Sequence, residues 1–417
     1  MRVLYLNPDR GIPILGDKGA SVHVREFVNA LARQNHQVAL ICASLGSGNA
    51  PPTASVLEVP PTASDADLAR ECALRELSIS ALDEQITRRE IARLHYDRNF
   101  VSRVMAVLDD TGFRPDLIYE RYALFHSQGA ALARTLGVPR ILEVNAPLIE
   151  EQERFRGLAL KAVAAESERA SFDGADAIVA VSNEVASYIN SLDARPRTVL
   201  VIPNGVDVSR FHPNAGGREL RVRLGLGTGP VIGFVGSFKP WHGSDFLIDA
   251  FARMARADAG VRLLCVGEGP ELEPARRKIA LLGLQNRVVL TGRVPHADVP
   301  AYLDVMDVSV APYVADSGFY FSPLKVVEAL AMGTPVVATR LGQLRMLVQD
   351  GVTGLLFNPG DQADFCAKVM GLIGDDDRRR AMSAVARRRA LAEFSWLRVA
   401  ARAMTEGQRL IDLGKAA

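Results

Sequence analysis

One carboxylate, Glu328, lies among the apolar residues Val327, Ala329 and Leu330 in the segment between Ser322 and Gly333. Ser322 and Pro323 are residue types that begin a helix, as cap and first helical residue, and Gly333 is of a type that ends one. The first turn of a helix leaves backbone N–H groups unpaired, so it attracts phosphate. A carboxylate one turn further in could accept both hydroxyls of a ribose. The segment predicts a nucleoside-diphosphate site; a helix that only packs on a sheet would leave Glu328 unexplained.

A second group of polar residues follows the apolar run 231–235. The glycine-bounded loop 236–243 carries Lys239 and His242. Departure of a diphosphate is stabilised by preorganised cations and N–H groups. His242 can donate to phosphate when neutral and more strongly when protonated, and Lys239 carries a charge. Both are therefore candidates for holding a diphosphate, with a solvent-facing Lys239 as the alternative.

Four motifs occur in an order that resembles the retaining glycosyltransferases of family 4, which have two Rossmann-like domains in the GT-B arrangement. They are similar to the family's interdomain junction, diphosphate loop, donor-binding helix and following glycine-rich turn, at residues 203–213, 235–243, 322–337 and 350–356. The resemblance covers nearly the whole chain. It implies an α/β fold in which two doubly wound parallel-sheet domains face a central cleft.

Three positions depart from the family's pattern. The resemblance places Ser237 and His242 where the family has an arginine and a lysine, and Tyr320 where it has its first glutamate. Lys239 is therefore expected to take over the charge on the diphosphate. Other strand-end loops would offer backbone groups to the base, phosphate or sugar; for Gly267, tight-turn geometry is the alternative. The expected donor-binding residues are Gly19, Ser237, Gly267, Val294, Tyr320, Phe321, Ser322, Pro323, Leu324, Lys325 and Glu328.

Polar residues also follow predicted strands in the first half of the chain. Glu120, Arg121 and Asn145 lie at strand ends, and the carboxyl ends of parallel strands line the ligand crevice in this class of sheet. The alternative is that they make structural hydrogen bonds beneath it. The glycine-containing loop 16–20 leads into a helix with His23 and, by resemblance, contacts donor phosphate or acceptor. The expected catalytic residues are Lys239, His242, Arg121 and Glu120, and the expected acceptor-side residues are Lys18, His23 and Asn145.

The elements that position these residues are visible as short apolar runs that alternate with amphipathic stretches. This pattern is typical of βαβ units and parallel sheets, and 417 residues are enough for two cores. Six such runs lie on each side of the junction. We expect an N-terminal acceptor-side domain, a C-terminal nucleotide-sugar-binding domain and a last helix that, by resemblance, returns to the first domain, over residues 1–207, 208–394 and 395–417.

Residues 46–110 interrupt the alternation. Residues 46–63 have the Gly, Pro, Ser and Thr content of a loop, and residues 64–110 form a charged, helix-like stretch. This is more than a crossover needs, so an insertion near the acceptor side is expected. Acceptor specificity should then lie in residues 10–25, 64–110 and 119–155.

Composition limits the function classes. The 49 basic and 48 acidic side chains leave a net charge of +1, which argues against a nucleic-acid-binding protein. Four scattered cysteines suit a reducing cytosol. No signal sequence and no apolar stretch of roughly 20 residues is found. We expect a cytoplasmic protein, with peripheral contact to the inner face of the membrane as an open alternative.

The leading hypothesis is a retaining glycosyltransferase of polysaccharide or glycoconjugate biosynthesis. It would move a hexose-type sugar from a UDP- or GDP-sugar to a hydroxyl on a small-molecule, glycan or lipid-linked acceptor, by front-face transfer without metal or cofactor. An epimerase or phosphorylase on the same fold is one alternative. A catalytically silent nucleotide-sugar-binding protein is the other.

Overall fold

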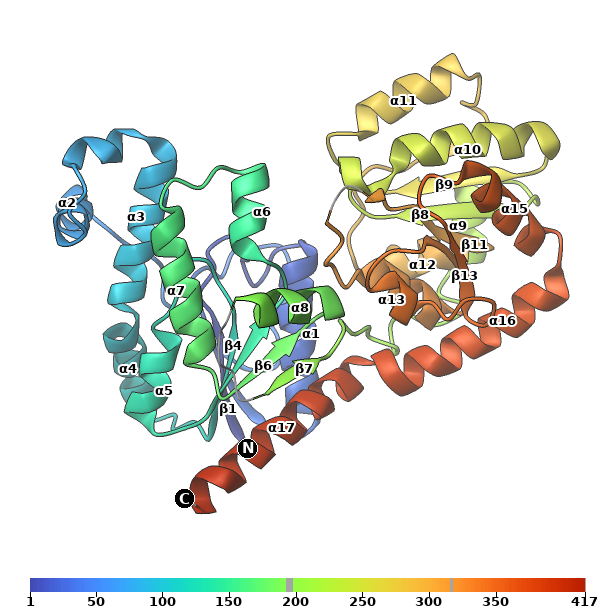
Figure 1. Ribbon diagram of the computed structural model, residues 1–417. Coiled ribbons are helices and arrows are strands. Elements are labelled where there is room, and N and C mark those ends of the chain that lie inside the picture. The colour runs from blue at the N-terminus through green and yellow to red at the C-terminus, as the bar shows by residue number, and fades with distance from the viewer. Residues whose placement is uncertain (193–197, 316–317, 417) are drawn as a thin grey trace. The chain divides into compact units, whose positions relative to one another are not determined.

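The computed structural model describes residues 1–192, 198–315 and 318–416. Two compact units divide the chain: unit 1 comprises residues 1–203 and 399–417, and unit 2 comprises residues 204–398. Each unit has a parallel sheet with helices packed on it (Figure 1). The two-domain α/β architecture expected from the alternating pattern is confirmed.

Unit 1 contains a seven-stranded parallel sheet in the order β3-β2-β1-β4-β5-β6-β7. The strands are β1 (Arg2–Asn7), β2 (Gln37–Cys42), β3 (Ser55–Glu58), β4 (Leu117–Arg121), β5 (Arg140–Val144), β6 (Ala177–Ala180) and β7 (Val199–Val201). From β1 the chain proceeds to one side of the sheet through β2 and β3, and then to the other side from β4 onward. The strand order therefore reverses between β1 and β4, the position at which such sheets bind ligands.

Helices connect these strands in unit 1. They are α1 (Gly19–Arg33), α2 (Asp65–Leu74), α3 (Gln85–Arg98), α4 (Phe100–Thr111), α5 (Gly129–Leu136), α6 (Leu148–Phe155), α7 (Lys161–Asp173) and α8 (Asn183–Ser191), with the short 3₁₀ helix η1 (Ile79–Asp83) between α2 and α3. The last helix, α17 (Trp396–Ala416), belongs to unit 1 from Val399 onward.

Unit 2 contains a six-stranded parallel sheet in the order β10-β9-β8-β11-β12-β13. Its strands are β8 (Val231–Val235), β9 (Arg262–Val266), β10 (Val288–Leu290), β11 (Val308–Ala311), β12 (Val336–Thr339) and β13 (Gly354–Phe357). Its helices are α9 (Gly217–Arg223), η2 (Pro240–His242), α10 (Ser244–Ala257), α11 (Leu272–Leu281), α12 (Val299–Asp304), α13 (Leu324–Met332), α14 (Leu344–Leu347), α15 (Gln362–Ile373), α16 (Asp376–Arg389) and the π-helical turn η4 (Ala390–Phe394).

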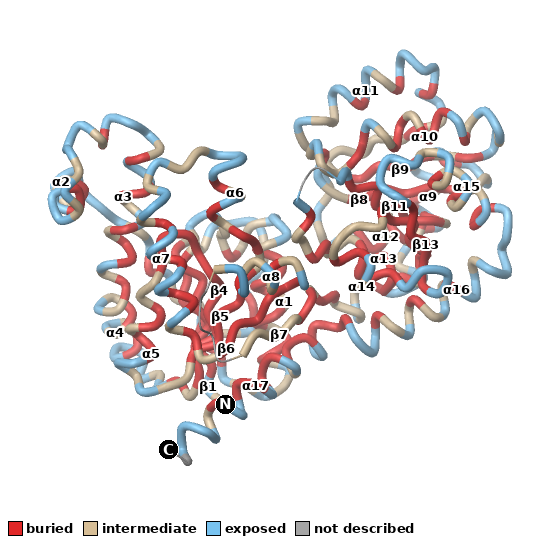
Figure 2. Tube along the Cα trace, viewed as in Figure 1, coloured by how far each residue is buried: buried red, intermediate tan, exposed pale blue. Residues whose placement is uncertain are grey.

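The strands of both sheets are buried along most of their length (Figure 2). Parallel sheets covered on both faces need apolar residues at successive positions rather than alternate ones. The runs Val231–Val235 and Val308–Ala311 meet that need because every residue in them is buried. This is why continuous apolar runs located the strands so well.

One expected loop contains a strand. Residues 46–63 were expected to be loop throughout, but Ser55–Glu58 forms β3, which pairs in parallel with β2 at the sheet edge. Its two apolar residues are only half-buried, so the segment lacks the run that marks the central strands. The first sheet has seven strands rather than the expected six. The helical prediction for residues 64–110 is confirmed by α2, η1, α3 and α4.

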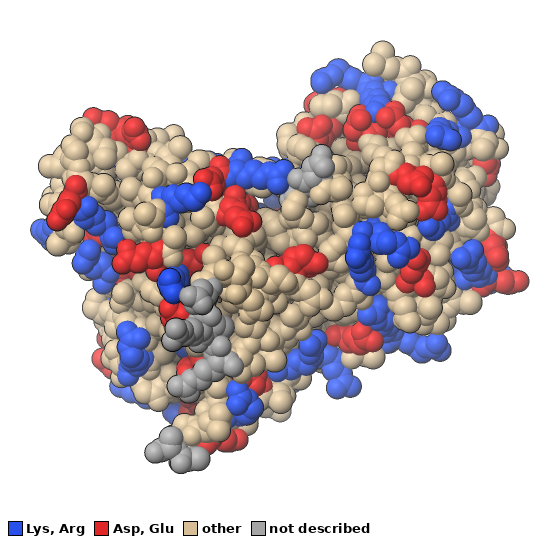
Figure 3. All heavy atoms as spheres, in the orientation of Figure 1, with Lys and Arg blue, Asp and Glu red and all other residues tan. Residues whose placement is uncertain are grey.

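Charges of both signs are interspersed on the face of each unit that Figure 3 shows, as the nearly balanced composition requires. Among the residues that the structure describes, no helix is both long and apolar enough to cross a membrane.

Candidate functional site

The predicted donor helix in unit 2 is α13. It begins after Pro323, which has an extended backbone (φ −74°, ψ 116°), and ends at Gly333, whose φ of 72° suits glycine. Ser322 had been predicted to cap this helix. Instead, Ser322 accepts hydrogen bonds from Asn204, through its Oγ from the backbone N–H (2.9 Å) and through its carbonyl from Nδ2 (2.6 Å). This pairing anchors the loop before α13 and, within the described ranges, leaves the first turn without a side-chain cap.

Glu328 is buried one turn into α13 and is paired. Its Oε1 lies 2.7 Å from Nε2 of His296, which precedes α12, and the carboxylate side chain is 7% exposed. The His296 ring packs 5.5 Å from that of Phe211. The imidazole thereby fixes the orientation of the carboxylate. Sequence reasoning missed His296, although it lies two residues after Val294, one of the expected donor-binding residues.

Lys325, in the first turn of α13, carries a buried ammonium group. Its Nζ has no hydrogen-bond partner among the described residues. The nitrogen lies 4.5 Å from the ring centroids of both Phe234 and Tyr313, where it makes cation–π contacts. Burial lowers the pKa of Lys325 to about 7. Lys325 was expected to bind the donor, but its position as a desolvated cation was not foreseen.

Gly236 lies directly against this lysine. Its φ is 142°, and a β-carbon there would approach Lys325 Nζ to 3.1 Å. The ammonium group therefore reaches the backbone at the start of the 236–243 loop, the expected diphosphate loop. The charge of α13 and the backbone of that loop converge at this point.

His242, in η2 of the same loop, is neutral at neutral pH. Its partial burial, together with the charge of nearby Lys325, lowers its pKa to about 3. Nδ1 donates to the carbonyl oxygen of Ser237, so Nε2 carries a lone pair. In this state the imidazole offers phosphate no positive charge. Lys239 is half-buried at the residue before η2, and its charge stays a candidate for the diphosphate.

The other expected donor residues lie around the same loops of unit 2. The ring of Phe321 stacks at 6.5 Å on that of Trp241 in η2, and Tyr320 packs against Phe321 at 4.4 Å. Leu324 opens α13, and Val294 packs on the core beneath it. Gly267 has a structural requirement, because a β-carbon there would lie 2.0 Å from the carbonyl oxygen of Gly236.

In unit 1, three predicted residues meet at one carboxylate, Glu143 at the end of β5. It accepts from Arg121 Nη1 (3.1 Å) and Asn145 Nδ2 (2.8 Å), and His23 Nε2 lies 2.9 Å away. The hydroxyl of Tyr119 donates to it as well, at 2.7 Å. Burial alone would raise the pKa of Glu143, but these partners outweigh burial and lower it to about 2. Glu143 was not predicted as a site residue, because nothing in its local sequence signals four partners.

Glu120 and Lys18 lie elsewhere in unit 1. Glu120 is fully buried and accepts from Arg140 Nε at 2.7 Å, so a catalytic role would require breaking that ion pair. Lys18 is exposed at the residue before α1, and its Nζ donates to the carbonyl of Gly11 at 3.2 Å. Gly19 is the exposed first residue of α1.

Comparison with known proteins finds a matching family for each of the two units. Residues 18–210 match the family described as Glycosyltransferase Family 4, and residues 229–375 match Glycosyl transferases group 1. The D-inositol 3-phosphate glycosyltransferase of Corynebacterium jeikeium (strain K411) is 32% identical over 311 residues, which cover 71% of this chain and 73% of that protein. The chain belongs to glycosyltransferase family 4.

Other relatives and solved structures that resemble this family 4 glycosyltransferase agree with that assignment. The GDP-mannose-dependent alpha-(1-6)-phosphatidylinositol monomannoside mannosyltransferase of Mycolicibacterium smegmatis is 33% identical over 62% of this chain and 66% of that protein. Across such curated relatives the chain spans about half to three quarters of their length. The crystal structure of Anabaena Alr3699/HepE in complex with UDP matches with a TM-score of 0.70 at 21% identity, over 98% of this chain and 100% of that one. That likeness supports the GT-B fold.

Proposed function

We propose that this family 4 glycosyltransferase moves a hexose-type sugar from a nucleoside-diphosphate sugar to a hydroxyl acceptor, with retention of configuration. The observation that carries the proposal is the buried, unpartnered ammonium group of Lys325 beside the 236–243 loop. Glu328, oriented by His296, follows on the next turn of the same helix. A cation for the diphosphate and a carboxylate for the ribose are thus built into one helix.

The mechanism follows from what these groups can do. The bond between the sugar's anomeric carbon and the diphosphate oxygen breaks, and its electron pair goes to the leaving phosphate. Lys325 and the N–H groups of the first turn of α13 stabilise that charge. The acceptor hydroxyl attacks the same face of the sugar, and its proton passes to the departing phosphate oxygen. Orientation and charge stabilisation then suffice, without a protein nucleophile.

The donor and acceptor are proposed by class. UDP and GDP are both candidates for the nucleotide, because one similar structure holds UDP and one relative is named for its use of GDP-mannose. The acceptor is a small molecule, glycan or lipid-linked hydroxyl. We further propose that the protein works in the cytoplasm, in contact with the inner face of the membrane when the acceptor is lipid-linked, and needs neither metal nor cofactor.

A catalytically silent nucleotide-sugar-binding protein is the second candidate, favoured by the neutral His242 and by Tyr320 at the position of the expected glutamate. Slow release of free sugar from a nucleotide sugar distinguishes the two. A transferase hydrolyses its donor slowly in the absence of acceptor, whereas a silent protein binds the donor and returns it intact.

The variant Glu328→Gln is expected to weaken UDP or GDP binding by about 10- to 100-fold, the effect of losing one charge-assisted hydrogen bond of roughly 1.5–3 kcal/mol. Glutamine retains an oxygen that accepts from His296, so the contact between α13 and the residue before α12 survives. Titration calorimetry with both nucleotides measures the change.

The matched control is Glu273→Gln on α11, which removes the same charge from an exposed carboxylate of the same unit. It should leave the affinity unchanged. Equal nucleotide affinity of Glu328→Gln and wild type would remove Glu328 from the ribose site and leave Lys325 as the one group that argues for a nucleotide diphosphate at α13.

A further inference from the structure

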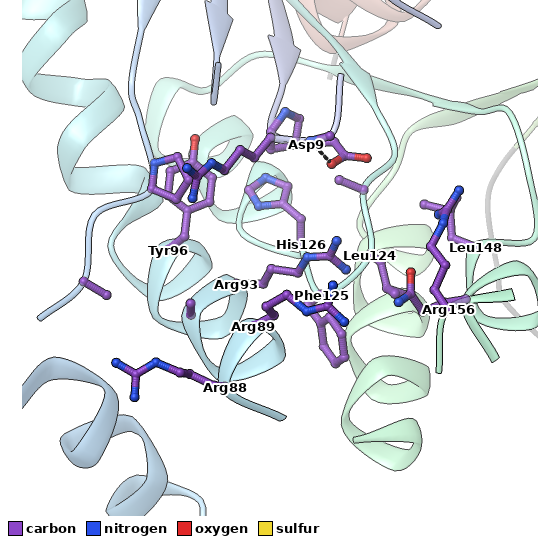
Figure 4. Close-up of a pocket in the computed structure, with 18 of the residues that line it drawn as sticks. Asp9, Arg88, Arg89, Arg93, Tyr96, Leu124, Phe125, His126, Leu148 and Arg156 are labelled. Atoms are coloured by element: carbon purple, nitrogen blue, oxygen red, sulfur yellow. Dashed lines mark hydrogen bonds between the residues drawn. The ribbon is translucent and has the colours of Figure 1, made fainter. Parts of the chain in front are cut away.

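Unit 1 contains a pocket of about 530 Å³ whose lining includes five arginines and one acidic residue, namely Arg10, Arg88, Arg89, Arg93, Arg156 and Asp9. We call it the arginine pocket (Figure 4). Its volume lies in the range of pockets that bind small molecules. None of the expected catalytic, donor-binding or acceptor-side residues lines it.

The arginine pocket lies at the point where the sheet reverses its strand order. Residues 8–11, directly after β1, line one side of it, and residues 123–126, after the end of β4, line another. β1 and β4 are parallel neighbours in the sheet. After β1 the next strand, β2, lies on one side of this pair, and after β4 the next strand, β5, lies on the other side. Open parallel sheets bind ligands outside the carboxyl ends of their strands at this position. Residues of the insertion, chiefly from α3, line a further side of the pocket.

The arginines differ in how their charge is used. Arg88 is paired with Asp65, and Arg156 with Glu151 at 2.9 Å. Arg10, Arg89 and Arg93 form no ion pair with any residue in the described ranges.

Asp9, the acidic residue in the lining, accepts the backbone N–H of Gly11 at 2.7 Å. The pocket therefore has an excess of positive charge that the protein itself does not neutralise.

Arg89 and Arg93 share one face of α3. Like charges four residues apart on a helix repel each other by a few tenths of a kcal/mol. In Figure 4 both side chains extend from α3 toward Leu124 and Phe125, whereas Arg88 projects the other way. Both arginines are exposed, so a ligand in the pocket can reach them. Two neighbouring cations that extend toward one cavity can bind two oxygens of one phosphate, because each guanidinium donates in a planar fork.

The frame around these arginines is rigid. Glu90, next to Arg89, is buried and accepts the backbone N–H groups of Ala159 (3.1 Å) and Leu160 (2.8 Å), which fixes α3 to the start of α7. Phe125 is buried with φ of 65°, a left-handed conformation that is rare for a large side chain. Such strain persists where the surroundings hold it, and it gathers at ligand sites. The segment 123–126 thus has an unusual backbone conformation where it lines the pocket.

The wall itself is largely apolar. Leu68, Tyr96, Leu124, Phe125 and Leu148 line it. A free inorganic anion would gain nothing from an apolar wall. A phosphate ester would use both the arginines, through its phosphate, and the apolar wall, through its carbon skeleton.

We propose that the arginine pocket binds the acceptor through a phosphate group, a mono- or diester, held by Arg89 and Arg93, with the adjoining carbon skeleton against the apolar wall. This rests on the proposed function, because it names the acceptor of that same transfer. A soluble sugar or polyol phosphate and a phospholipid headgroup present the same chemistry.

Binding of three probes to the full chain tests the proposal: inorganic phosphate, D-inositol 3-phosphate with inositol as its uncharged match, and phosphatidylcholine vesicles with and without phosphatidylinositol. Calorimetry serves the soluble probes and co-sedimentation the vesicles. Phosphatidylcholine also carries a phosphodiester, but its choline cation neutralises it, so vesicles of this lipid alone are the uncharged match. We expect at least one anionic phosphate probe to bind, and the double variant Arg89→Gln/Arg93→Gln to bind it at least about tenfold more weakly. Binding of D-inositol 3-phosphate points to a soluble acceptor, and binding of the vesicles alone points to a headgroup.

The control is Arg134→Gln, an exposed arginine of α5 outside the pocket, which should bind as the wild type does. Failure of all three probes to bind the wild type, or equal binding by the double variant, would overturn the proposal. UDP and GDP binding to the double variant is measured in parallel and should be unchanged. If the wild type bound neither UDP nor GDP, the proposed function would be contradicted instead, since binding of the phosphate probes does not depend on nucleotide binding.

Discussion

Replacing Lys325 with methionine is expected to lower turnover by about 10²-fold or more, the usual cost of losing one charge-stabilising group at a leaving group. The ammonium nitrogen is buried between Phe234 and Tyr313 without a hydrogen-bond partner in the described part of the chain, so the cation–π contacts with these two rings are what its charge contributes to the fold. Methionine has a similar length and no charge. Release of nucleoside diphosphate from a nucleotide sugar, with and without acceptor, measures the effect.

The same variant is expected to keep or raise the melting temperature, because it removes an unpaired charge from a buried position. Lys368→Met on α15, which removes a lysine paired with Asp364, is the control and should keep full turnover. Full turnover of Lys325→Met together with loss in Lys239→Ala would show that Lys239 supplies the charge, as the sequence alone had suggested.

The pKa of Lys325 adds a dependence on pH. In the folded, unliganded protein the group loses its proton near pH 7, whereas an unfolded lysine keeps it to about pH 10. Between these values the unfolded state binds more protons, so this group makes the folded state more stable as the pH rises from about 7 to about 10. Nucleoside-diphosphate binding should weaken over the start of that window, since the free protein has lost the cation. Lys325→Met should flatten both dependences.

The strands that the sequence predicted well are those whose buried positions are consecutive. Val231–Val235 and Val308–Ala311 are apolar throughout because both faces of a parallel sheet are covered. β3 escaped prediction because an edge strand with two half-buried apolar residues looks like loop. Glu328 was predictable for the opposite reason, since a lone carboxylate in an apolar helix stands out.

The partners of the site residues were not predictable in the same way. His296 meets Glu328 from 32 positions away in the chain, and Lys325 is buried because Phe234 and Tyr313, from two other segments, cover its nitrogen. The convergence on Glu143 depends likewise on α1 and β4 meeting at the end of β5. Such contacts follow from the order of strands in the sheet, which a single sequence does not show.

Glu120 is a residue for which sequence position and structural position suggest different roles. It was expected to be catalytic because it precedes the end of a strand at the ligand edge of the sheet. In the structure its carboxylate and the guanidinium of Arg140 are both fully buried, and Arg140 also donates to the carbonyl (2.8 Å) and hydroxyl (2.9 Å) of Ser171. Gly129 packs so closely that a β-carbon there would lie 1.7 Å from Glu120 Oε2. Oε2 is therefore enclosed by Arg140 and Gly129, and Oε1 lies 3.5 Å from His126 Nε2.

The variant Glu120→Gln is therefore expected to lower the free energy of unfolding by about 3–5 kcal/mol, because it leaves the charge of Arg140 buried without a counter-ion. Urea unfolding measures the loss, provided that the dependence of the unfolding free energy on urea concentration is the same in the variant and the wild type. Turnover per folded molecule, measured well below the unfolding midpoint, should stay near that of the wild type. A drop of about 10²-fold in turnover at unchanged stability would instead make Glu120 catalytic.

Two further variants separate the buried pair from charge effects in general. Asp116→Asn removes a carboxylate from the partly exposed pair with Arg2 in the same sheet and should cost about 1 kcal/mol or less. Glu120→Met/Arg140→Met replaces both buried charges by apolar side chains, which removes the uncompensated charge and should recover much of the stability that Glu120→Gln loses. If the double variant were as unstable as the single one, the hydrogen bonds to Ser171 rather than the ion pair would hold this part of the sheet together.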